Sequence, residues 1–123
     1  MTLPIPTAYA RPEAPSRTPR AVEYDLLARI TARLASASAA KGHDHHGFVA
    51  ALNDNLALWS TFAADVASEG NGLPALLRAR LFWLYEFTAS HSRAVLEGKA
   101  EATVLVEINT AVMRGLRGEG ATP

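Results

Sequence analysis

The sequence predicts an all-α protein, a single bundle of about four helices that follows an extended, proline-rich N-terminal segment. Four stretches repeat apolar residues at the three- and four-residue spacing of an amphipathic helix. Short glycine-containing breaks separate these stretches. No stretch alternates apolar and polar residues as a half-buried strand does. Helices joined by such short connections typically pack as a bundle.

Composition restricts the class of function. The chain has 123 residues, of which 49% are hydrophobic and 20% charged, as expected for one globular domain. Twelve basic and twelve acidic side chains give a net charge of zero, so direct binding of nucleic acid is not expected. The absence of cysteine excludes disulfides and thiolate metal sites and fits a reducing compartment. There is no signal peptide and no apolar run long enough for a bilayer, which predicts a cytoplasmic protein without membrane attachment.

Three segments are expected along the chain. Residues 1–17 contain four prolines and should be extended or flexible, because proline cannot propagate a helix. Residues 18–117 should form the helical domain, and residues 118–123 a flexible tail.

The first helix should begin at Thr18 and Pro19 and fray towards Gly42. Thr18 can cap it, and Pro19 suits the first turn, where its missing N–H costs nothing. Its apolar stripe consists of Val22 or Leu26, then Leu27, Ile30 and Leu34.

The second helix should run from Asp44 or Gly47 to Ser68. Its apolar face, at 100° per residue, comprises Phe48, Leu52, Leu56, Trp59, Phe62, Ala63 and Val66. Leu58 falls on the opposite side with Asp54 and Asp65, which predicts an exposed leucine.

The third helix should span Leu73 to Glu97, between a break at Gly70 and another at Gly98. Its main stripe comprises Leu77, Leu81, Leu84, Thr88, His91 and Val95. A second strip comprises Leu76, Trp83, Phe87 and Ala94, and Phe82 points almost opposite the main stripe. A helix with two apolar faces is either the central helix of the bundle or a helix with one face left for a partner.

The fourth helix should span Ala100 to Leu116. Its stripe comprises Val104, Leu105, Ile108, Val112 and Leu116. Asn109 here and Asn55 in the second helix lie at the edges of apolar stripes, where an amide needs a specific partner or fixes the register.

Residues able to carry chemistry do not form a recognisable site. His43, His45 and His46 surround Asp44, but consecutive residues rarely converge on one metal ion, and Asp44 is better interpreted as a helix cap. No serine lies in a nucleophile context, and no glycine-rich phosphate loop follows a strand. We therefore expect no enzyme, no cofactor and no metal.

Short motifs in order along almost the whole chain resemble the flagellar biosynthesis regulator family FlaF. The matching pieces are Ala8-Tyr9, "TPRAVE" with Pro19, Arg20 and Glu23, "NLALW" with Asn55, Leu58 and Trp59, then Asp65, "NGLPALLRARL" with Asn71, Leu73, Pro74, Leu77, Arg78 and Ala79, then His91, Val95, Leu96, Gly98, "LVEIN" with Ile108 and Asn109, and Gly115-Leu116. The proline-rich N-terminus and "HDHHG" depart from the family pattern.

The resemblance implies regulation rather than catalysis. FlaF-like proteins promote flagellin production, in opposition to the FlbT family, and are thought to bind flagellin in a chaperone-like way before export. The expected partner-binding residues are Asn55, Leu58, Asp65, Arg78, Phe82, Trp83 and Asn109. Of these, Leu58, Phe82 and Trp83 would contact the partner, whereas Asn55, Asp65 and Asn109 would form hydrogen bonds or fix the register.

Two other interpretations remain at this point. The protein could act after transcription by touching RNA or an FlbT-like partner directly, although the neutral charge argues against RNA. Alternatively, the spare apolar face could be a homodimer interface.

Overall fold

The computed structural model describes residues 19–117, with side-chain burial over residues 23–115. Four helices make up this part of the chain: α1 Pro19–Ala39, α2 His45–Ala67, α3 Ala75–Leu96 and α4 Thr103–Arg117. No strand occurs between residues 19 and 117, so the all-α prediction is confirmed. Pro19 opens α1 as expected, whereas Thr18 and the segments 1–17 and 118–123 lie outside the described residues.

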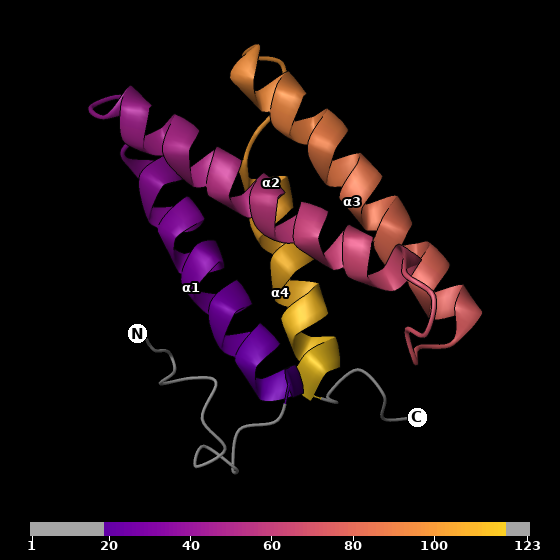
Figure 1. The fold of residues 1–123 in the computed structure, drawn as a ribbon. Coiled ribbons are helices and arrows are strands. Elements are labelled where there is room, and N and C mark those ends of the chain that lie inside the picture. The colour runs from indigo at the N-terminus through magenta and orange to yellow at the C-terminus, as the bar shows by residue number, and fades with distance from the viewer. Residues whose placement is uncertain (1–18, 118–123) are drawn as a thin grey trace, which may run out of the picture.

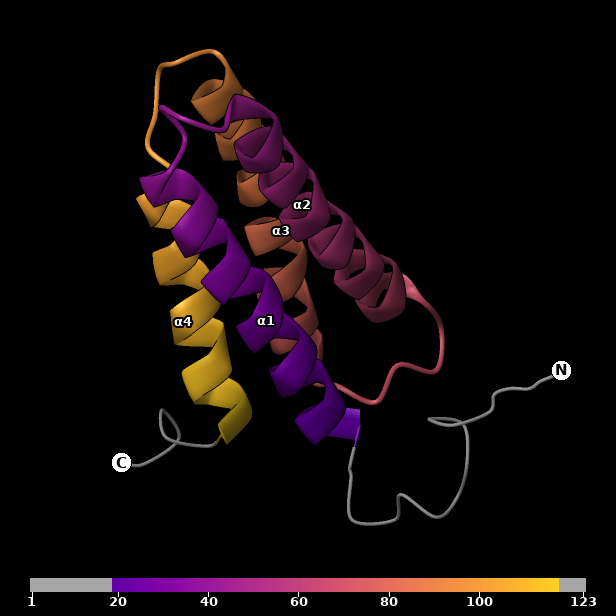
Figure 2. The same ribbon diagram turned by 90° about the vertical axis from the view of Figure 1, so that its left-hand side faces the viewer.

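The helices form an open bundle. α2 packs against both α1 and α3, α1 also packs against α4, and α3 and α4 approach each other over a short stretch only (Figure 1). The α1–α2 and α3–α4 connections lie at one end of the bundle, and the α2–α3 connection lies at the other (Figure 2). We call the first the closed end and the second the open end.

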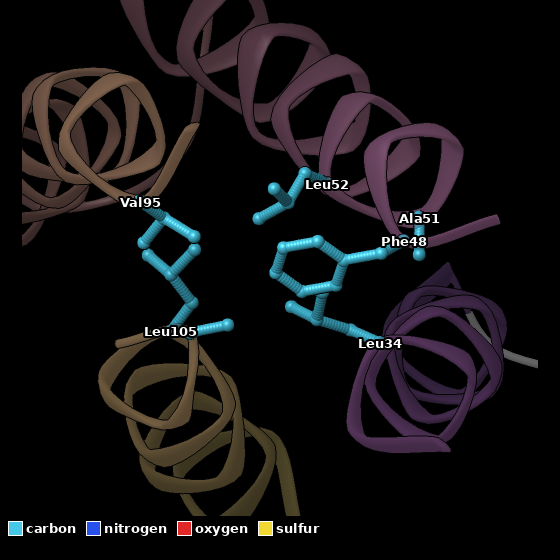
Figure 3. Packing of buried hydrophobic residues seen from close by; sticks show 7 residues of the cluster. Leu34, Phe48, Ala51, Leu52, Val95 and Leu105 are labelled. Carbon is cyan, nitrogen blue, oxygen red and sulfur yellow. The ribbon is translucent and has the colours of Figure 1, made fainter. Parts of the chain in front are cut away.

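A tight apolar cluster holds the closed end together. Its fully buried members come from all four helices and are Leu34, Phe48, Ala51, Leu52, Val95, Ala102 and Leu105 (Figure 3). Leu34 and Val95 are near the C-termini of α1 and α3, whereas Phe48 and Leu105 are near the N-termini of α2 and α4. Because this cluster sits at one end, α3 and α4 are joined there and not along their whole length.

Capping defines the turn between α1 and α2. The Asp44 side chain accepts a hydrogen bond from the Gly47 backbone N–H at 2.9 Å, which satisfies one of the free N–H groups at the start of α2. The predicted cap is therefore confirmed. His43, His45 and His46 are all exposed around it.

The other helix ends differ slightly from expectation. α3 begins at Ala75, directly after Pro74, and α4 begins at Thr103 rather than Ala100. Gly98 adopts a φ of 76°, a left-handed conformation that ends α3, and the residues that follow it form the connection.

The prediction that Leu58 is exposed is wrong, since its side chain is only 7% exposed. The face of α2 that carries Leu58 meets α1: the neighbouring Asp54 forms an ion pair with Arg33 of α1. Asp54 and Asp65 lie at the solvent-exposed edge of this face. Leu58, between them, is covered by the packing of the helices. The buried residues of α2 form one continuous face, and Leu58 lies at its edge beside Ala51 and Asn55 and not on the opposite side of the helix.

Candidate functional site

Four polar side chains form a hydrogen-bond network inside the bundle. Asn109 of α4 lies at its centre and accepts a bond from Trp59 Nε1 at 2.9 Å. Its Nδ2 donates to Asn55 Oδ1 at 2.7 Å and to Thr31 Oγ1 at 3.1 Å. Thr31 Oγ1 in turn donates to the Leu27 carbonyl at 2.6 Å.

This network has a structural role. It joins α1, α2 and α4, and all four of its side chains are buried. Asn55 and Asn109 make the hydrogen bonds that their positions in the sequence predict. They nevertheless offer no exposed surface to a partner, and Leu58 is buried beside them on α2.

A second group of predicted residues holds the α2–α3 turn. The Asn71 side-chain amide donates to the Asp65 carbonyl at 3.1 Å and to its carboxylate at 3.3 Å. Asn71 Oδ1 accepts from the Leu73 N–H at 3.0 Å, and Arg78 Nε donates to the Leu73 carbonyl at 3.2 Å. Asp65 and Arg78 therefore hold the chain as it enters α3.

The outer face of α3 is the main exposed apolar surface among the described residues. Leu76 is 64% exposed, Trp83 59% and Phe82 38%. Between these large side chains lie Ala75 and Ala79, one turn apart. Phe82, Trp83 and both alanines line a shallow depression against the end of α2. We call this surface the α3 outer face.

Aromatic stacking continues this surface towards the closed end. Trp83 stacks on Phe87 with ring centroids 5.7 Å apart, and Phe87 stacks on His91 at 5.3 Å. The His91 ring nitrogen Nε2 is 2.8 Å from the Glu101 carbonyl in the α3–α4 connection. Trp83, Phe87 and His91 thus form a continuous row of stacked rings along α3.

A separate groove opens between α3 and α4 towards the open end. It has a volume of about 530 Å³ and is lined mainly by apolar side chains. Those on α3 are Leu77, Leu81 and Leu84, and those on α4 are Ile108, Ala111 and Val112. We call this cavity the α3–α4 groove.

Two further features of the described residues concern metal ions and membranes. Between residues 19 and 117, no group of three or more His, Cys, Asp or Glu side chains is placed to hold a metal ion. None of the four helices is both long enough and apolar enough to cross a bilayer.

Comparison with known families assigns the chain. The family described as flagellar protein FlaF matches residues 6–116. The chain belongs to the FlaF family. No curated protein and no solved structure matches the chain significantly.

The FlaF match covers both the helices and the motifs that the sequence analysis quoted. In the structure these motifs fall into two groups: Trp59, Asn55 and Asn109 lie in the interior, and Asp65, Asn71 and Arg78 hold the α2–α3 turn. Of the predicted partner-binding residues, Phe82 and Trp83 lie together on the α3 outer face. Leu76 and the two alanines were not among those candidates, although the seven-residue spacing of Leu76 and Trp83 was a usable signal.

Proposed function

We propose that this flagellar protein binds flagellin before export, in a chaperone-like way, through the α3 outer face. The observation that supports the proposal is the exposure of Leu76, Phe82 and Trp83 on one helix of a FlaF-family chain. Exposed apolar patches of this kind are typical of interaction sites, whereas singly scattered apolar residues are not. Trp is also among the side chains that contribute most at interfaces.

The shape of the α3 outer face suits a helical ligand. Ala75 and Ala79 are small and lie one turn apart, with Phe82 on one side and Leu76 and Trp83 on the other. Helices pack with axes about 8–10 Å apart when the residues at the contact leave room. Unassembled flagellin ends are amphipathic helical segments, and the apolar side of such a segment could lie over the alanines between the larger side chains.

Arg78 and Glu86 complete the rim of the depression. Opposite charges at two points of a rim favour one direction of a bound helix over the reverse, while they contribute little affinity. Arg78 thus has two functions in this proposal: it holds the turn through the Leu73 carbonyl and lies at the edge of the contact surface.

The proposed activity is regulatory and not enzymatic. By holding unassembled flagellin in the cytoplasm, the protein would couple flagellin synthesis to filament assembly. Binding of an FlbT-like partner or of RNA to the same surface would be a different function, and the experiment below distinguishes these from flagellin binding.

The test compares two variants that remove exposed apolar side chains from the same helix. Trp83→Ala lies within the α3 outer face, whereas Leu96→Ala removes a 47% exposed side chain near the closed end. Trp83→Ala should weaken flagellin binding by about 2 kcal/mol, or roughly thirtyfold in Kd, as loss of an interface anchor does. Leu96→Ala should leave binding unchanged, and both variants should keep the melting temperature within a few degrees.

The second part of the test measures how the Kd depends on salt concentration. Titration calorimetry with flagellin should give nearly the same Kd at low and moderate salt, because burial of apolar surface depends little on ionic strength. Binding of RNA would weaken steeply with added salt. Unchanged flagellin binding by Trp83→Ala would reject the α3 outer face, and binding only of RNA or of an FlbT-like protein would reject the flagellin proposal.

A further inference from the structure

The flagellin proposal does not involve the α3–α4 groove. Most of the side chains that line the groove are apolar, and exposing them to water is unfavourable. Leu77 is 41% exposed, and Leu81, Leu84, Ile108 and Val112 are only partly buried. Phe62, Asp65 and Val66 of α2 also line the groove. Such a concave, mostly apolar cavity is the usual form of a binding site.

We propose that residues 3–9 of this same chain occupy the α3–α4 groove. The first argument is position. Glu23 and Gly115 line the groove, and Glu23 is only four residues after Pro19, the first residue of α1. The chain that precedes α1 is therefore attached beside the groove, at the open end of the bundle.

The second argument is reach. Ten residues connect Tyr9 to Pro19, and an extended chain advances about 3.3 Å per residue, so the tether spans up to roughly 33 Å. The helix rise of 1.5 Å per residue places Leu84 only about 10 Å along α3 from Leu77. Residues 3–9 can thus reach every part of the groove.

The third argument is chemistry. Residues 1–10 contain no charged side chain, and Leu3, Ile5 and Tyr9 are apolar or amphipathic. Pro4 and Pro6 restrict the backbone to extended conformations, which reduces the entropy lost when the segment is ordered in a groove. A short apolar segment of this kind is suited to a cavity lined mainly by leucine, isoleucine, valine and phenylalanine, with the charged side chains Glu23, Asp65 and Arg80 also in its lining.

The fourth argument comes from the family match, which begins at residue 6 and so includes thirteen residues ahead of α1. Within the proposed segment, residues 6–9 and their Ala8-Tyr9 pair lie inside the match, and residues matched together with the helices are expected to contribute to the fold. A tethered segment also has an effective concentration of the order of millimolar, which favours it over a free ligand or a second copy for the same groove.

The chain has no cysteine, so introduced pairs can report the contact without interference. In the full chain, Ile5→Cys is combined with Val112→Cys in the groove or, as the matched control, with Ala79→Cys on the α3 outer face. The proposal predicts that the groove pair forms an intramolecular disulfide at least about tenfold faster than the control pair under mild oxidation, a preference of about 1.4 kcal/mol. Circular dichroism of the reduced variants checks that both are folded.

Equal rates for the two pairs, or slow reaction of both, would overturn the proposal, because the segment would then have no preference for the groove. Disulfides that appear only between molecules would overturn it in favour of a second copy. A further variant guards against effects of the introduced cysteines: Ile5→Asp should lower the melting temperature, whereas Thr2→Asp should not. No flagellin is present in these measurements, so their outcome is independent of the flagellin proposal.

Discussion

At the scale of single residues, the Asn109 side chain is the centre of the hydrogen bonds inside the bundle. Asn109 uses both its oxygen and its nitrogen, and its three side-chain partners come from α1 and α2. A buried polar group without a partner costs about 1–3 kcal/mol, so the bonds of Asn109 favour the one arrangement of helices that makes them, although Asn55 Nδ2 has no partner within the described residues.

Two buried threonines differ in their hydrogen bonding and allow a matched test. Thr31 Oγ1 accepts from Asn109, whereas Thr88 Oγ1 has no partner within the described part of the chain. Thr31→Val should lower the free energy of unfolding by about 1–2 kcal/mol, because the Asn109 amide loses an acceptor. Thr88→Val should be neutral within about 0.5 kcal/mol or stabilising. Urea unfolding measures both, and equal losses would show that the network contributes nothing specific.

Leu58 gives a second prediction at this scale. Because its side chain is buried, Leu58→Ala should lower the free energy of unfolding by about 2–4 kcal/mol through lost burial and the cavity left behind. Leu76→Ala, at a side chain that is 64% exposed, should change it by no more than about 0.5 kcal/mol. Equal stability of Leu58→Ala and Leu76→Ala would contradict the burial of Leu58.

At the scale of elements, the α2–α3 turn determines the direction in which α3 leaves α2. Gly70 has a φ of 87°, a conformation that side chains other than glycine rarely adopt. The Asn71 side chain forms hydrogen bonds with the backbone of both Asp65 and Leu73. The Arg78 side chain, in the first turn of α3, donates a hydrogen bond to the Leu73 carbonyl. The turn positions α3 so that its outer face remains exposed.

Substituting two glycines of this turn distinguishes the effect of backbone strain from the effect of steric crowding. A Cβ at Gly70 or at Gly72 would meet no atom within 4 Å, but only Gly70 has a positive φ. Gly70→Ala should therefore lower the free energy of unfolding by about 1–2 kcal/mol, whereas Gly72→Ala should leave it unchanged or raise it slightly. Thermal or urea unfolding measures both variants. Similar free energies of unfolding for Gly70→Ala and Gly72→Ala would contradict the left-handed conformation at Gly70.

At the scale of the whole molecule, the bundle has one closed and one open end. The apolar cluster joins all four helices at the closed end, whereas α3 separates from α4 towards the other. Both candidate surfaces follow from this asymmetry, since the groove lies inside the opening and the outer face lies on the helix that forms its wall.

Hydrogen exchange should reveal the same asymmetry. Amides in residues 78–84 of α3 should exchange faster than those in residues 105–112 of α4, because regions with few buried contacts open at lower free energy. Residues 88–95 of α3, which contain its buried side chains, serve as the control within the same helix. Uniform protection along α3 would indicate that the open end is as firmly packed as the closed end.

Local sequence pattern was sufficient for much of this fold. Helix spacing, the glycine at each main break and the Asp44 cap act within a few residues of one another, and the helices that they predict are present. The central positions of Leu34, Leu52, Trp59 and Leu105 followed from the same periodicity. The order of short motifs along the chain was likewise enough to predict the family, which the match over residues 6–116 confirms.

Only the tertiary structure decided which faces meet. Leu58 lies at the edge of the buried face of α2, next to two acidic positions, and the packing of the helices decides that it is covered. The bonds of Asn109 join residues 50, 54 and 78 positions away, so no local pattern could have assigned them. The two apolar faces of α3 were visible in the sequence, but their separation into a groove and an outer face depends on the angle between α3 and α4, which is set by packing at the closed end.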